Sequence, residues 1–124
     1  MLTSSAKAKG RRAAQELAKH LLAYSVGHAE LTEDDIKPVS SSVTGEDIGL
    51  SSEARKLYPF TFEVKNQESI QIWKALKQSE SHAEDTGLIP ILCFKRNHSE
   101  SYVSLRLSDF LHLFLHEPKD TSGT

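Results

Sequence analysis

The sequence is poor in cysteine, with one residue of this type among 124, and it contains no long apolar run. A single cysteine excludes an intrachain disulfide and a zinc site made of four thiolates. The longest apolar segment, residues 88–94, is too short to span a bilayer, and the N-terminal residues do not form the apolar stretch of a secretory signal. We therefore expect no membrane association and a cytoplasmic location.

Several catalytic motifs are also missing. The sequence has neither a Gly-rich phosphate loop nor a G-x-S-x-G segment, so nothing in it favours a nucleotide hydrolase or a serine hydrolase. Cys93 lies inside the apolar run without a paired base, which indicates a packing role. His112 and His116 have a spacing that can bind zinc, but the glutamate of the H-E-x-x-H pattern is absent, and we expect no metal there.

The composition that remains is that of a globular protein, with 38% hydrophobic and 26% charged residues. The length fits one domain, and we expect an ordered core over about residues 7–116 and a flexible tail over residues 117–124. Basic residues dominate residues 1–28 and acidic residues dominate residues 29–54. This distribution suits a protein that contacts a polyanion and holds a cation, although solvated surface charge would give the same pattern.

Hydrophobic periodicity predicts an α/β fold with a central mixed sheet flanked by helices. The predicted helices cover residues 7–28, 68–82 and 109–116, the first with an inner stripe from Gly10 to Tyr24 and His28 and the last capped by Ser108. A serine-capped helical turn is expected over residues 51–56. The predicted strands cover residues 36–39, 43–50, 60–66, 88–94 and 102–107. Trp73, at helical spacing with Ile72 and Leu76, is expected in the core.

The strand over residues 60–66 alternates strictly between apolar and polar residues, which predicts one buried face. Glu63 and Lys65 lie on the polar face. Asp47 lies on the preceding long strand, opposite its apolar residues. If these two strands pair, Asp47, Glu63 and Lys65 share one face of the sheet.

Two neighbouring carboxylates repel each other unless a proton or a cation lies between them. Mg²⁺ prefers oxygen ligands, so two carboxylates and a carbonyl suit it, and Mn²⁺ should be able to substitute. Lys65 beside such a cation would orient a water molecule and stabilise charge on a phosphate. The chemistry indicated is hydrolysis of a phosphodiester. The alternative is that Glu63 and Lys65 form an ordinary surface pair on a half-exposed sheet.

These residues resemble the PD-(D/E)xK nuclease superfamily, whose shared core has the order α-β-β-β-α-β. The resemblance covers about residues 7–107 and rests on Gly45-Glu46-Asp47-Ile48 and Glu63-Val64-Lys65, with Glu46 in place of the motif's proline. A second E-x-K tripeptide, residues 117–119, has no strand around it. The small archaeal and phage Holliday-junction resolvases are the most similar members, since they share this size and a glutamate on the first helix.

The resemblance implies roles for individual residues. Asp47, Glu63 and the carbonyl of Val64 would be metal ligands, Lys65 the catalytic lysine and Glu16 a supporting acid. Independently of the resemblance, Gln67 continues the alternation of Glu63 and Lys65 and would contact a phosphate or a metal-bound water, or else it begins the next helix. The resemblance also implies a homodimer that cuts four-way DNA junctions. Another repair or restriction-like nickase or exonuclease, and a non-catalytic nucleic-acid-binding module, remain alternatives.

Contacts with the DNA backbone require cations more than any particular sequence. The candidate DNA-binding residues are Lys9, Arg11, Arg12, Lys19, Ser42, Thr44, Lys74, Lys77, Lys95 and Arg96.

Overall fold

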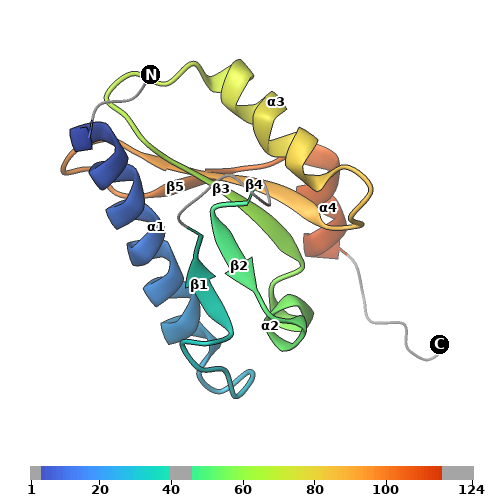
Figure 1. The fold of residues 1–124 in the computed structure, drawn as a ribbon. Coiled ribbons are helices and arrows are strands. Elements are labelled where there is room, and N and C mark those ends of the chain that lie inside the picture. The colour runs from blue at the N-terminus through green and yellow to red at the C-terminus, as the bar shows by residue number, and fades with distance from the viewer. Residues whose placement is uncertain (1–3, 40–45, 116–124) are drawn as a thin grey trace.

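A computed structural model describes residues 4–39 and 46–115 of the chain (Figure 1). Its elements follow the order α1 (Ser4–Ser25), β1 (Ile36–Pro38), β2 (Ile48–Leu50), α2 (Ser52–Leu57), β3 (Phe60–Asn66), α3 (Ile72–Ala83), β4 (Ile89–Lys95), β5 (Tyr102–Ser104) and α4 (Leu107–Leu115). The α/β architecture and the core order of the elements are those expected. No helix within the described ranges is long and apolar enough to cross a membrane.

The strands form two small sheets. β3, β4 and β5 make a mixed sheet in which β4 is central, parallel to β3 and antiparallel to β5. β1 and β2 make an antiparallel pair beside it. Two adjacent parallel strands need a crossover connection, and α3 provides it between β3 and β4. β4 is buried on both faces, as its continuous apolar run predicts.

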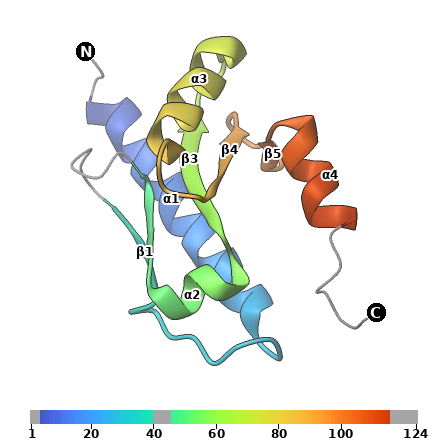
Figure 2. The same cartoon turned by 90° about the vertical axis from the view of Figure 1, so that its right-hand side faces the viewer.

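Helices cover both faces of the β3–β4 pair, as Figures 1 and 2 show. α1 packs on the face that carries Phe62 and Val64 of β3 together with Ile91 and Cys93 of β4. α3 lies over the opposite face. The apolar face of β3 is therefore buried against α1, as its alternation predicts.

The prediction of a half-exposed β3 is wrong, because the polar face is buried as well. Thr61 and Glu63 are only 2% and 5% exposed. The reason lies in α3, whose buried residues Ala75, Ser79 and Ala83 are all small and recur every four positions. Small residues along one helix face allow a close approach to the sheet. The surface-pair interpretation of Glu63 is incompatible with this burial.

The same small residues correct the expected helix faces. Trp73 lies outside the stripe of Ala75, Ser79 and Ala83 and is 81% exposed, so its expected core position is wrong. In α1 the buried stripe runs through Ala13, Ala14 and Ala18 and ends at Ser25. Leu17 and Leu21 pack at its edge. The expected inner residues at its C-terminal end, Tyr24 and His28, are exposed.

Other boundaries shift modestly. Ser51 caps α2, accepting a hydrogen bond from the Ala54 N–H at 3.1 Å. α4 begins at Leu107, so Ser108 lies inside the helix and is not its cap. β2 is described only from Ile48, and the rest of the strand expected over residues 43–50 lies largely outside the described residues.

Candidate active site

The backbone of β3 holds the carboxylate of Asp47. The Asp47 N–H donates to the Phe62 carbonyl at 2.9 Å, and Asp47 Oδ2 accepts from the Val64 N–H at 2.7 Å. β2 itself pairs with β1, so the expected ladder between β2 and β3 is replaced by these two hydrogen bonds. They nevertheless place Asp47 beside Glu63 and Lys65, as the sequence predicts.

Glu63 lies between two basic side chains. Its Oε2 is 3.6 Å from Lys65 Nζ, and its Oε1 is 2.9 Å from Nδ1 of His82 on α3. Oε1 makes no well-aligned hydrogen bond within the described residues, despite the closeness of His82. The Glu63 side chain is 6% exposed and the Lys65 side chain 22% exposed, so both charges are largely withdrawn from water.

Burial destabilises the charged form of both carboxylates. Burial raises the pKa of Asp47, and the hydrogen bond from Val64 opposes this rise only in part. Burial also raises the pKa of Glu63, and the negative charge of Asp47 raises it further. The positive charges of Lys65 and His82 lower both values without reversing the shift. A proton or a bound cation between Asp47 and Glu63 would therefore offset the cost of burying the two negative charges.

An open pocket of about 430 Å³ lies where these groups meet, and it is lined by Asp47, Glu63, Val64, Lys65 and Gln67 together with Ala6 and Gly10 of α1.

The N–H of Val64 points to Asp47, away from β4. In an extended strand the N–H and C=O of one residue point to the same edge. The Val64 carbonyl therefore points to the same edge as Asp47.

This donor set suits a hard divalent cation. Two carboxylates and one main-chain carbonyl are oxygen donors, and Mg²⁺ normally retains several waters beside such ligands. Within residues 4–39 and 46–115, no group of three or more His, Cys, Asp and Glu side chains could hold a metal. Side chains of the described residues therefore offer such a cation only part of its ligands.

Glu16 does not join this group. It lies on α1, its side chain is 53% exposed, and its Oε1 is 3.6 Å from Nζ of Lys95. Its charge also contributes to raising the pKa of Cys93, which lies on the α1 side of the sheet. Glu63 lies on the α3 side. The structure therefore does not bring Glu16 to the pocket, in contrast to its expected supporting role.

Basic side chains flank the pocket on both sides. A hollow of about 450 Å³ shares Asp47 and Gly10 with the pocket and is lined by Lys7 and Arg11. A second hollow of about 260 Å³ shares Lys65 and Gln67 with it and is lined by Lys74. Since they share lining residues, the three hollows adjoin one another between α1 and α3. We refer to them together as the basic track.

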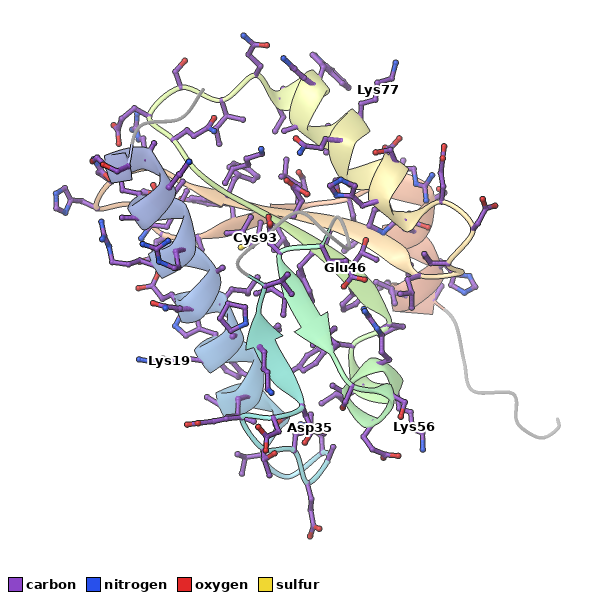
Figure 3. The ribbon with its side chains drawn as sticks, viewed as in Figure 1. Lys19, Asp35, Glu46, Lys56, Lys77 and Cys93 are labelled. Atoms are coloured by element: carbon purple, nitrogen blue, oxygen red, sulfur yellow. The ribbon has the colours of Figure 1, made fainter. Side chains whose placement is uncertain are left out.

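The remaining candidate DNA contacts lie outside the basic track. Lys95 and Arg96 line a further hollow that shares Gln67 and Glu68 with the pocket, and Lys19 lies in another with Glu33 and Asp34. Lys19 and Lys77 point outward from α1 and α3 in Figure 3. Lys9 and Arg12 line none of the hollows of the basic track. Ser42 and Thr44, like His116 and the 117–119 tripeptide, lie outside the described residues.

Two residues near the site were not predicted. His82 contacts Glu63 from α3, and only the small-residue stripe around it would have indicated that it faces the sheet. Arg55 of α2 binds both carboxylate oxygens of Glu46 at 2.9 and 3.0 Å and also donates to the Phe60 carbonyl. Arg55 thus links Glu46, the residue before Asp47, to Phe60 at the start of β3.

Comparison with known proteins identifies the family of the chain. The sequence matches the family described as phage putative PDDEXK endonuclease over residues 5–122. Searches among curated proteins and among solved structures found no significant match. The family match spans nearly the whole chain, including every group in the pocket. This chain therefore belongs to the phage PDDEXK endonuclease family.

Proposed function

We propose that the chain is a Mg²⁺-dependent, structure-selective DNA endonuclease that resolves four-way junctions by phosphodiester hydrolysis. The observation that carries the nuclease assignment is the convergence of Asp47, Glu63 and Lys65 on one pocket. Membership of the endonuclease family supports it independently. The preference for junctions rests on the resemblance to small resolvases in size and in a glutamate on the first helix.

In this proposal Asp47, Glu63 and the Val64 carbonyl bind the cation. Bound Mg²⁺ would neutralise charge on the scissile phosphate and acidify a water molecule. Lys65 reaches the same pocket and carries the positive charge that developing negative charge on the phosphate requires. Gln67, at the end of β3, supplies an amide that can orient the water or a phosphate oxygen. Mn²⁺ would replace Mg²⁺, since it accepts the same oxygen ligands.

The basic track gives the DNA backbone a route through the site. Lys7 and Arg11 lie on one side of the acidic pocket and Lys74 on the other. A strand in the track would meet cations before and after the carboxylates, which offsets the repulsion between the phosphates and the acidic residues. This arrangement favours a nuclease that holds a strand across its site.

A homodimer completes the proposal. A four-way junction has near-twofold symmetry, and a twofold dimer would present two identical sites to two symmetry-related strands. Each copy would supply one pocket and one basic track.

Cleavage assays test the proposal directly. A synthetic four-way junction and a linear duplex of the same sequence are incubated with the protein, with and without Mg²⁺, and the nicks are mapped. We expect paired, symmetric nicks in the junction, none in the duplex and none without the cation. Cleavage of both substrates would indicate a less selective nuclease of the same family. Binding of the junction without cleavage would indicate a non-catalytic module.

A further inference from the structure

α4 is an apolar helix that nothing covers within the described residues. None of its nine residues is buried, and six of them are leucine or phenylalanine. Leu107, Phe114 and Leu115 are 70%, 72% and 63% exposed. A helix of this composition is normally buried on most sides. Figure 2 shows α4 beside β5, at the far edge of the sheet from β3.

The apolar residues form an ordered stripe along α4. Five of them are spaced three, one, three and one residues apart, which places them on one side of the helix. These residues are Leu107, Phe110, Leu111, Phe114 and Leu115. The rings of Phe110 and Phe114 stack with centroids 6.1 Å apart. This spacing is that of a helix that packs along its length against another helix. We call these five residues the α4 stripe.

We propose that the α4 stripe is the surface on which two copies of this chain dimerise, with the two α4 helices antiparallel. The inference deepens the proposed function, which includes a homodimer, by assigning its interface. A twofold interface must be complementary to itself. An antiparallel pair centred between Phe110 and Leu111 sets Leu107 against Phe114 and Phe110 against Leu111 of the other copy.

The size and charge of the surface agree with a second copy. Five large side chains that are 42–72% exposed offer roughly 500 Å² of surface, more than half of the about 800 Å² that each partner buries in a typical stable complex. The stripe contains no charged residue, so two copies meet without like-charge repulsion. The antiparallel arrangement also aligns the helix dipoles favourably.

The chain's own tail is a poor alternative occupant. Residues 116–124 contain none of Val, Ile, Leu, Met, Phe, Tyr or Trp, so this segment has no apolar side chain of matching size to place on the stripe. An exposed apolar surface of several hundred Å² usually marks an interaction site. A second copy supplies the same five side chains in return.

Sedimentation and light scattering test the assignment at micromolar concentration. We expect the wild-type chain to have the mass of a dimer and the variant Phe110→Glu/Phe114→Glu the mass of a monomer with an unchanged circular dichroism spectrum. Tyr24→Glu, at an equally exposed apolar residue of α1, is the matched control and should stay dimeric. A double variant that remains dimeric overturns the α4 interface and leaves the homodimer standing. A wild-type monomer overturns both and leaves the nuclease assignment untouched.

Crosslinking provides a second test that does not depend on charge insertion. Leu111→Cys should form a disulfide between copies on mild oxidation, because residue 111 lies next to the proposed twofold axis. Leu113→Cys, on the same helix but outside the stripe, is the control and should crosslink poorly. Burial raises the pKa of Cys93 to about 11, so the native thiol does not compete. Equal crosslinking at both positions would overturn the antiparallel arrangement.

Discussion

The carboxylate of Asp47 accepts a 2.7 Å hydrogen bond from the main-chain N–H of Val64, the residue between Glu63 and Lys65. The strand that carries two of the candidate catalytic groups thus fixes the third through its own backbone. The distance between the acids is set by strand geometry and requires no long flexible side chain. This arrangement explains why the tripeptide and the upstream aspartate act as one unit.

Loss of any member of the group should abolish cleavage without loss of the fold. We predict that Asp47→Asn, Glu63→Gln and Lys65→Ala each lower the rate of junction cleavage by at least about 100-fold, the effect of removing one preorganised charged group. Gel-shift assays should show retained junction binding. Glu117→Gln, in the second E-x-K tripeptide, is the control and should cleave at the wild-type rate. Unfolded variants would indicate a structural role instead.

Removing the charge of Glu63 should stabilise the metal-free protein. Folding raises the pKa of Asp47 and Glu63 above 3.8 and 4.5, so the folded state binds more protons than the unfolded chain in this range. Protonation of Asp47 and Glu63 therefore contributes to the free energy of unfolding, and this contribution is lost as the pH rises through their raised pKa values. We predict that Glu63→Gln increases the Tm at neutral pH and flattens its fall with rising pH. An unchanged or lower Tm would contradict this account.

Measurements of Tm also detect binding of the cation. Adding Mg²⁺ or Mn²⁺ should raise the Tm of the wild-type protein, since a ligand that binds only the folded state stabilises it. The rise should be absent in Glu63→Gln. Equal shifts in the two proteins would show that the cation binds elsewhere.

Gly10 offers a way to block the pocket without disturbing the fold. A Cβ added at Gly10 would meet no atom within 4 Å, and the residue lines both the pocket and the adjoining hollow. We predict that Gly10→Ala stabilises the protein by about 0.5–1 kcal/mol, as expected inside a helix, and leaves cleavage intact. Gly10→Phe should fold equally well but cleave at least about 10-fold more slowly, because its ring enters the substrate path. Equal activity of the two variants would exclude Gly10 from that path.

Arg55 should matter for activity although it lies outside the pocket. Its ion pair with Glu46 is largely shielded, with side chains 22% and 16% exposed. We predict that Arg55→Ala costs about 1–3 kcal/mol of stability and also slows cleavage, because the residue before Asp47 loses its anchor. Lys56→Ala, which removes an exposed pair with Glu53, is the matched control and should cost less than about 0.5 kcal/mol. Chemical denaturation and cleavage rates measure both effects.

The sequence predicted β3 and β4 from their apolar patterns. It predicted the grouping of Asp47, Glu63 and Lys65 from pairing of β2 with β3, whereas two hydrogen bonds to β3 bring Asp47 there. Alternation cannot tell what covers a face. The polar face of β3 is buried because Ala75, Ser79 and Ala83 let α3 approach closely, and apolar periodicity gives small residues little weight. Trp73 was misplaced for the same reason, since the largest apolar residue of a helix is not always on its buried side.

Glu16 shows a different limit. The resemblance implied its supporting role, and a position on the first helix alone does not determine the side of the sheet from which a side chain approaches. Its partner Lys95 lies on the side of β4 that faces α1. Only the packing of α1 against the sheet shows on which side the Glu16 side chain lies.

Every group at the candidate site except the small residues of α1 comes from residues 46–82, and α4 lies at the opposite edge of the sheet. The candidate catalytic and metal-binding residues thus come from one continuous segment of the chain. α4, on which we propose that the dimer forms, follows this segment. A substitution confined to α4 would therefore change this proposed assembly surface without changing any residue of the pocket.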